Sequence, residues 1–361
     1  MTSDVRRRTC DGAPATTRAR RATCNVRRTI SHVRSSPAAP HLTRVVLLVA
    51  AMVCGAGSAS AQARFALIVS GATGGQEYSA QYSGWCRDLA STLVEKLRFD
   101  PGAVTVLSEA AGPATAATAA NVRRVLTGMS RTMARDDLLL IVLIGHGTFD
   151  GVDARFNLVG PDLESADWAG LLRPLIGRVV VVDTTASSFP FLERLAAPRR
   201  IVITATDSAG QRFDTVFPGY FVRALADESS DLDKNNRISI WEAFVAASAS
   251  VRRHYQQRGQ LSTERALLDD NGDGVGADVA EQGSDGSFAS RTYLDEAHPG
   301  ARPTDEVLVR LLQRQAVLTT EVDDLRIRKT FLAPDEYSRE FERLMIELAR
   351  VAHDIRARVG S

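Results

Sequence analysis

Two stretches of this sequence place a histidine and hydroxyl side chains directly after apolar runs. His146 stands between Gly145 and Gly147 after LLLIVLI, and Thr185 and Ser187 follow VVVVD. A histidine beside a hydroxyl or thiol can take its proton and activate it as a nucleophile for acyl transfer. If both runs are neighbouring parallel strands, these side chains meet at one edge of the sheet. The plainer alternative for His146 is a residue that only hydrogen-bonds loop carbonyls.

An acidic stretch further along the chain has the spacing of an EF-hand calcium loop. The oxygen donors of such a loop fall at positions 1, 3, 5, 7, 9 and 12, and position 7 offers its backbone carbonyl. These positions are held here by Asp231, Asp233, Asn235, Arg237, Ser239 and Glu242. Asn236 replaces the usual glycine, and asparagine enters the left-handed backbone region more readily than most residues. The pattern predicts a Ca²⁺ site, and the alternative is a solvated turn without an ion.

A second acidic loop follows the same opening and then departs from it. Asp269, Asn271 and Asp273 fit the first three ligand positions, but position 12 is Ala280 and Glu281 comes one step late. We expect a partial ion site or a tight turn here.

Five continuous apolar runs predict the strands that would carry the polar groups. They are RFALIVS (64–70), VTVLS (104–108), LLLIVLI (138–144), VVVVD (179–183) and IVITAT (201–206). Continuous runs are typical of strands buried on both faces. Apolar residues at helical spacing lie between them, such as Trp85, Leu89 and Leu93. The alternation predicts an α/β fold with a mostly parallel sheet and helices on both faces.

The last sixty residues change to a heptad-like pattern. Apolar residues step by three and four between Leu308 and Leu325, and again between Tyr337 and Ile355. Pro334 separates the two stretches and suits the first position of a helix. An antiparallel helical hairpin is therefore predicted. It either packs on its own domain or serves as a partner-binding or self-associating arm.

The charge is unevenly distributed along the chain. The 361 residues carry a net charge of +1, but residues 1–61 contain ten arginines and two acids. This leaves 34 basic and 41 acidic residues for 62–361, a net charge of −7. A nucleic-acid partner bound through bulk positive charge is excluded for such a chain.

The basic segment ends in the pattern of a secretory signal peptide. Arg44 precedes the apolar run 45–54, which is too short for a stable membrane anchor, and the small residues of 59–61 suit a signal peptidase. We expect cleavage after Ala61 and a periplasmic or secreted protein. A lipoprotein signal at Cys54 is the rival, but Met52 and Val53 do not suit it. The length of residues 1–40 favours a true start further along, such as Val33.

The strand-end segments resemble the caspase/legumain-type cysteine peptidases, most closely legumain-like bacterial members. The likeness is carried by LLLIVLIGHG, RVVVVDTTASSFPFL and RIVITATDSAGQRFDTVFPGYFVRAL, and it spans roughly residues 64–275. It implies a caspase-like α/β/α sandwich in which His146, beside Gly147, is the family's histidine. Asp183 and Ser187 match the pattern around the family's catalytic cysteine, but that cysteine is replaced by Thr185 and the final glycine by Ser188.

The replacement of the cysteine leaves three interpretations of this chain. A threonine hydroxyl is far harder to deprotonate than a thiol, and an internal Thr185 has no N-terminal amine to serve as its base. The first interpretation is a caspase-like domain without catalysis that binds a protein or peptide. The second is a hydrolase in which Thr185, Ser187 or Ser188 acts with His146. The third, a phosphate loop at 71–75, is weak because no Lys-Ser/Thr pair follows.

These observations predict four segments. They are a basic leader with its signal peptide (1–61), a caspase-like core (62–228), an extension with the calcium loop (229–300) and the helical hairpin (301–361). Cys10, Cys24 and Cys54 belong to the leader, so Cys86 would be the only cysteine of the exported chain and could form no internal disulfide. Its position between Trp85 and Leu89 indicates a core residue.

Overall fold

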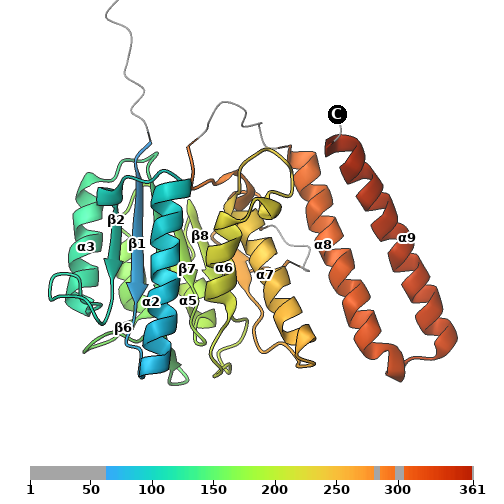
Figure 1. The fold of residues 1–361 in the computed structure, drawn as a ribbon, viewed down its shortest axis with the longest axis horizontal. Coiled ribbons are helices and arrows are strands. Elements are labelled where there is room, and N and C mark those ends of the chain that lie inside the picture. Colours follow the sequence, from blue (N-terminus) through green and yellow to red (C-terminus); the bar gives the residue numbers. More distant parts are fainter. Residues whose placement is uncertain (1–61, 280–284, 297–304, 360–361) are drawn as a thin grey trace, which may run out of the picture. The chain divides into compact units, whose positions relative to one another are not determined.

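A computed structural model describes residues 62–279, 285–296 and 305–359 of the chain. Its centre is a six-stranded sheet (Figure 1). The strands lie in the order β2 (Val104–Leu107), β1 (Arg64–Ser70), β3 (Leu138–Ile144), β7 (Arg178–Asp183), β8 (Arg200–Thr204) and β9 (Leu267–Asp269). All neighbouring pairs are parallel except β8 and β9, so the prediction of a mostly parallel sheet is confirmed.

The apolar runs form central strands because both of their faces are buried. Every residue of β3 is buried, and alternate side chains enter two different cores. Leu138, Leu140 and Val142 belong to one core, whereas Leu139 and Ile141 belong to the other. A strand with a core on each face has no position for a polar side chain, so its polar residues gather beyond its end.

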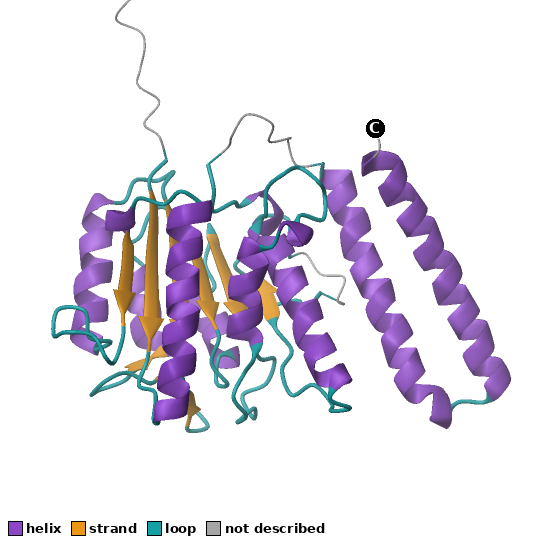
Figure 2. Cartoon of the chain, viewed as in Figure 1, coloured by secondary structure: helices purple, strands orange, loops and turns teal. Residues whose placement is uncertain are grey.

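Helices cover both faces of the sheet (Figure 2). The first core takes side chains from α2 (Gln76–Ser91), α6 (Phe217–Ala226) and α7 (Ile240–Gln257). The second takes side chains from α3 (Ala119–Thr132), α4 (Ser165–Leu172) and α5 (Phe189–Leu195). The expected α/β/α sandwich is confirmed. Cys86 lies in the first core and is 5% exposed, as expected.

Short elements connect the main ones. A small antiparallel sheet of β4 (Gly147–Phe149), β5 (Ala154–Phe156) and β6 (Leu163–Glu164) follows β3 directly. A π-helical turn, η1 (Thr92–Lys96), continues α2. The 3₁₀ turns are η2 (Pro101–Ala103), η3 (Glu228–Ser230), η4 (Ala289–Arg291) and η5 (Arg328–Phe331).

The predicted helical hairpin is present as α8 (Glu306–Ile327) and α9 (Pro334–Val359). Its own core includes Leu318, Leu325 and Leu344. Leu308 and Leu312 from the first turns of α8 join the core beside α6 and α7, which supports packing on its own domain. Among the described residues, no helix is both long and apolar enough to cross a membrane. The predicted leader and its cleavage after Ala61 lie outside the described residues.

Candidate functional site

The predicted strand-end residues come together at the carboxyl ends of β3 and β7. These strands are parallel neighbours, with Leu143 in register with Asp183, so the segments that follow them start side by side. A Cβ atom added at Gly147 would lie 2.7 Å from Thr185 Oγ1, which shows how closely the two segments approach. The expectation that the His146 and Thr185 segments lie together is confirmed. Only a residue without a side chain fits at Gly147 while Thr185 keeps its position.

His146 is held by groups on three different segments. Its Nε2 lies 3.2 Å from the Thr73 carbonyl oxygen and 3.3 Å from the Tyr82 hydroxyl. Its Nδ1 lies 3.3 Å from a carboxylate oxygen of Asp214. A carbonyl oxygen can only accept, so Nε2 carries a proton whenever it bonds to Thr73. In that state Nε2 cannot take a proton from a neighbouring hydroxyl.

Two tyrosines of α2 complete the surroundings of His146. The ring of Tyr78 meets the imidazole edge-on at 4.7 Å between centroids, and its hydroxyl donates to Asp214. This hydrogen bond raises the pKa of Tyr78, while burial is the main cause that raises the pKa of Tyr82. Tyr78 and Tyr82 are four residues apart on one helix, so they face the same side. They keep the imidazole in an aromatic, hydrogen-bonded setting.

Thr185 lies at the position predicted for a nucleophile, but its hydroxyl is closed off. The residue is 1% exposed, and Oγ1 has no hydrogen-bond partner among the described residues. Its backbone N–H donates to Asp183 Oδ1 over 2.9 Å. Asp183 is fully buried, and burial raises its pKa to about 6. Because Thr185 Oγ1 has no partner in the described part of the chain, no hydrogen bond joins this hydroxyl to His146.

The neighbouring serines are also turned into the protein. Ser187 is 5% exposed and Ser188 is fully buried. The Ser188 hydroxyl lies 3.0 Å from Thr206 Oγ1 and also accepts from the Thr206 backbone N–H. These groups tie the turn after β7 to the end of β8. The arrangement has the elements of an acyl-transfer site without a hydrogen-bonded histidine–nucleophile pair.

The sequence alone did not reveal the partners of His146. Thr73 and Asp214 lie in irregular loops after β1 and before α6, where no periodic pattern places a side chain. The tyrosines did carry a signal, since Tyr78 and Tyr82 recur at helical spacing.

The predicted calcium loop connects η3 to α7, and its carboxylates converge. One carboxylate oxygen from each of Asp231, Asp233 and Glu242 lies within 4.8 Å of the other two. Asn236 has a φ of 67°, the left-handed conformation expected for the residue that replaces glycine. The Arg237 guanidinium turns away from the carboxylates to pair with Asp295, with Nη2 to Oδ1 at 2.7 Å.

Glu242 also organises the loop through hydrogen bonds. Its Oε1 accepts from the backbone N–H groups of Leu232 and Asp233, and its Oε2 accepts from the N–H and hydroxyl of Ser239. Ser239 in turn caps the start of α7, which makes the pair a capping box. Four donors use the four acceptor sites of this carboxylate. Glu242 would have to release some of them to become a bidentate ligand.

Asp231 and Asp233 keep acceptor capacity for a cation. Each of their carboxylate oxygens accepts a hydrogen bond from the Asn235 or Asn236 segment, which leaves further lone pairs. Burial, followed by the charge of Glu242, raises the pKa of Asp233 to about 7. Converging carboxylates with an amide oxygen from Asn235 and a carbonyl from Arg237 are the donor types that Ca²⁺ prefers.

In the second acidic loop, backbone N–H groups engage the first two carboxylates. Asp269 accepts from the backbone N–H groups of Gly272 and Gly274, and Asp270 accepts from those of Phe288 and Ala289. Of the two expectations, these contacts favour the tight turn. Ala280 and Glu281 lie outside the described residues.

No family model and no curated protein matches the sequence. Among solved structures, a protein from Geobacter sulfurreducens aligns with a TM-score of 0.39 and 16% identity, over 58% of this chain and 93% of that one. The crystal structure of caspase-1 from Spodoptera frugiperda aligns with a TM-score of 0.37 and 9% identity, over 58% of this chain and 87% of that one. Similarity at this level concerns the fold and assigns neither substrate nor activity. The legumain type and the replacement of a catalytic cysteine stay predictions.

Proposed function

We propose that this protein is an exported caspase-like domain that binds a protein or peptide and has no peptidase activity. One observation carries the proposal: Thr185, at the position predicted for the nucleophile, is sealed from solvent, with its hydroxyl unbonded. A peptidase needs a nucleophile that reaches the substrate carbonyl and a base that takes its proton. Neither requirement is met by Thr185 with His146 in this arrangement.

Binding would use the edge of the sheet around His146. Two large apolar side chains are exposed next to this region in sequence: Phe189 follows Ser188 and is 37% exposed, and Phe213 precedes Asp214 and is 67% exposed. Aromatic side chains beside hydrogen-bonding groups are typical of surfaces that hold peptides. The helical hairpin offers a second surface, suited to self-association. Ca²⁺ bound between Asp231, Asp233 and Asn235 would stabilise the fold and take no part in chemistry.

The proposal is tested by restoring the thiol. The variant Thr185→Cys should stay unlabelled by an electrophilic peptide probe that carries a thiol-reactive group, because residue 185 is 1% exposed and has no hydrogen bond to His146, which a thiol needs to supply thiolate. Wild type should neither react with the probe nor cleave a library of peptides and esters. Mass spectrometry of the intact protein detects labelling, and mass spectrometry of the library detects cleavage. Labelling in the variant would indicate that the recognition surface around residue 185 is retained.

Two further variants separate chemistry from burial. If Thr185→Cys is labelled, a fall of at least about tenfold in Thr185→Cys/His146→Ala would show that the imidazole activates the thiol. Thr185→Val removes the unbonded hydroxyl at nearly constant volume, so its stability should equal or slightly exceed that of wild type. Peptide cleavage by wild type that is lost in both Thr185→Val and His146→Ala would overturn the proposal in favour of the hydrolase.

A further inference from the structure

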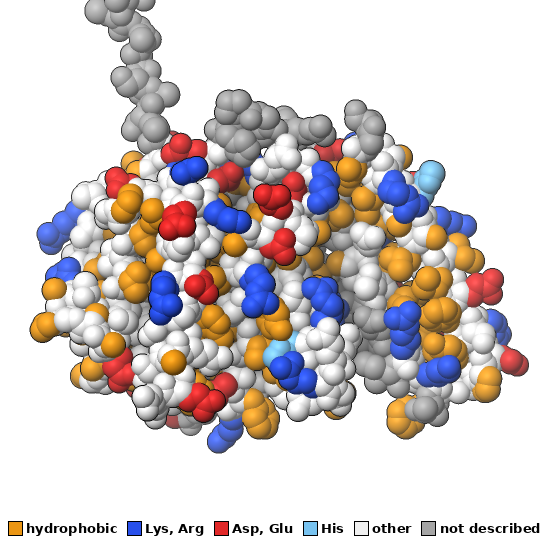
Figure 3. All heavy atoms as spheres, viewed as in Figure 1, with side chains coloured by type: hydrophobic (Ala, Val, Ile, Leu, Met, Phe, Trp, Pro, Cys, Tyr) orange, Lys and Arg blue, Asp and Glu red, His pale blue; other side chains and the backbone are white. Residues whose placement is uncertain are grey.

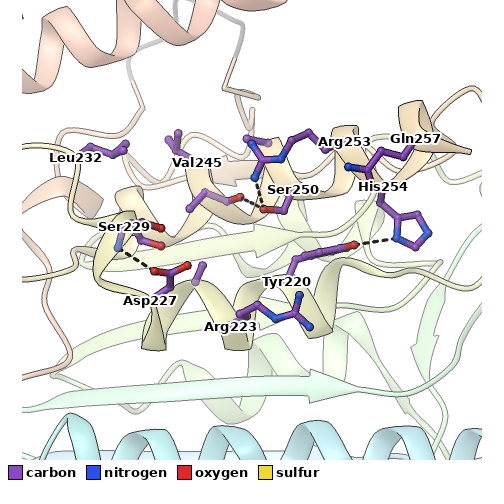
Figure 4. Close-up of a pocket in the computed structure, with 14 residues that line it drawn as sticks. Tyr220, Arg223, Asp227, Ser229, Leu232, Val245, Ser250, Arg253, His254 and Gln257 are labelled. Carbon is purple, nitrogen blue, oxygen red and sulfur yellow. Dashed lines mark hydrogen bonds between the residues drawn. The ribbon is translucent and has the colours of Figure 1, made fainter.

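A groove runs between α6 and α7, on the face of the sheet that also carries α2. Its volume is about 500 Å³, which is within the range of small-molecule sites. Figure 4 shows the side chains that line it, with Tyr220 and Arg223 on α6 and Ser250, Arg253 and His254 on α7. It shares no residue with the His146 cluster or with the carboxylates of the calcium loop.

The groove exists because small residues line the packed sides of the two helices. Ala224 on α6 and Ala246 and Ala249 on α7 all line the groove, and larger side chains at these positions would occupy part of it. Polar and charged side chains lie on either side of these alanines. Small residues alone define only a shape, so the chemistry of the groove depends on its charges.

Two arginines of the groove have no acidic partner among the described residues. Arg253 donates to the Ser250 hydroxyl over 2.9 Å, and Arg223 lies over the Tyr220 ring at 5.5 Å from its centroid. Both side chains are exposed, one on each helix. Figure 3 shows basic and acidic side chains interspersed over the face of the molecule that carries α2, α6 and α7.

The groove contains a single acid. Asp227, at the end of α6, accepts from the backbone N–H of Ser229 over 2.9 Å. Hydrogen bonds from the backbone and then the side chain of Ser229, with a smaller contribution from the charge of Lys96, lower the pKa of Asp227, so this carboxylate stays ionised. Lys96, Arg223, Asp227 and Glu228 line an adjoining pocket, where two basic and two acidic side chains balance, so the excess of positive charge is confined to the groove itself.

His254 adds a further hydrogen-bonding group. Its Nδ1 lies 2.9 Å from the Tyr220 hydroxyl. Burial, followed by the charge of Arg258, lowers the pKa of His254, which favours the neutral ring at pH 7. When Nδ1 of a neutral ring accepts from Tyr220, Nε2 carries the proton and is a donor.

We infer that this groove binds a phosphate group, held between Arg223 and Arg253. Guanidinium groups bind oxyanions through charge-assisted hydrogen bonds. The donors here stand on two opposite walls, and the several oxygens of a phosphate can meet both walls at once, whereas a planar carboxylate is satisfied by one guanidinium. The phosphate belongs either to a soluble ester or to a lipid headgroup.

The test is calorimetric titration of the full chain with inorganic phosphate and with glycerol phosphate at constant ionic strength. Saturable binding at one site is expected, with acetate at least about tenfold weaker. Arg223→Gln and Arg253→Gln should each weaken binding by about tenfold or more, since each removes a charge-assisted hydrogen bond. Arg131→Gln makes the same charge change on α3, which packs on the other face of the sheet, and should leave affinity unchanged.

The lipid source is distinguished by sedimentation with vesicles that contain phosphatidic acid. Binding to these vesicles that the two groove variants abolish, together with weak binding of soluble phosphate, supports the same site with a lipid ligand. The inference is overturned if neither probe binds, if acetate binds as well as phosphate, or if Arg131→Gln weakens binding as much as the groove variants. Because all three substitutions are at exposed side chains, circular dichroism should show an unchanged fold.

Discussion

The carboxyl-end edge of the sheet and the loop 231–242 both collect polar side chains, and they satisfy them in opposite ways. At the sheet edge, Thr185 Oγ1 and Asp183 Oδ2 are buried without a hydrogen-bond partner among the described residues. In the loop, every carboxylate oxygen of Asp231, Asp233 and Glu242 accepts at least one hydrogen bond. Unpartnered buried groups cost stability, whereas a satisfied network contributes to it. The first region leaves two buried polar atoms unsatisfied, and the second uses its groups to shape the chain.

The largest effect is expected from removing the centre of the loop network. Glu242 is 2% exposed, and Glu242→Ala leaves four hydrogen-bond donors without their acceptor. The free energy of unfolding should therefore fall by about 3 kcal/mol or more. Urea unfolding followed by fluorescence measures the change. The control Glu342→Ala removes an exposed carboxylate of α9 and should change stability by less than about 0.5 kcal/mol. A Glu242→Ala variant as stable as this control would remove the contrast between the two regions.

A smaller effect is expected from calcium itself. At a concentration about a hundredfold above its dissociation constant, Ca²⁺ should stabilise the wild type by about 2.7 kcal/mol and raise its melting temperature. Asp233→Asn should lose this rise. In chelator the same variant should melt at or above the wild-type temperature, because it removes one charge from a crowded cluster.

The second loop supplies the control for the calcium experiment. Asp273→Asn changes an exposed carboxylate of the 269–274 turn in the same way, and it should keep the full calcium response. Scanning calorimetry measures the melting temperatures of wild type, Asp233→Asn and Asp273→Asn with calcium and with chelator. A wild type indifferent to calcium would contradict the site.

The smallest effect is a pH dependence that belongs to the sheet edge. The pKa of Asp183 is raised to about 6 by burial, so the folded protein holds its proton more tightly than the unfolded chain does. Stability from this group is therefore present at low pH and declines as pH rises through about 6, by about 1 kcal/mol between pH 5 and 7. Asp183→Asn keeps the shape without titrating, and its urea midpoint should change less over this range. An equal slope in both proteins would assign the dependence to other groups.

The central strands could be predicted from the sequence, because burial on both faces of a strand produces a continuous apolar run. The run 138–144 predicted a central strand, and its end placed His146 beside the Thr185 segment. The spacing of the acidic loop likewise placed Asp231, Asp233 and Glu242 together. In each case a local sequence pattern determines the backbone conformation, and the backbone conformation positions the side chains.

What the sequence did not predict depends on contacts between distant segments. Asp214 reaches His146 from a loop with no periodicity, and the strand Leu267–Asp269 joins the sheet with only three residues. Glu242 was predicted as a ligand, and its hydrogen bonds also place it at the third position of the capping box of α7, whose N-cap is Ser239. A ligand position and a capping position share one residue type at one spacing, so the pattern could not distinguish them.

The anchoring of the first strand has a practical consequence for immobilising the protein. Arg64 donates to the carbonyl oxygens of Leu97, Arg98 and Leu294, which fastens the amino end of β1. Because β1 runs parallel to β3 and β7, this end lies opposite the edge that holds His146 and Thr185. A biotin or affinity tag placed just before Arg64 would tether the protein by a rigid point on the far side. On a sensor chip, the edge around His146 would then face the flowing solution, in a single defined orientation.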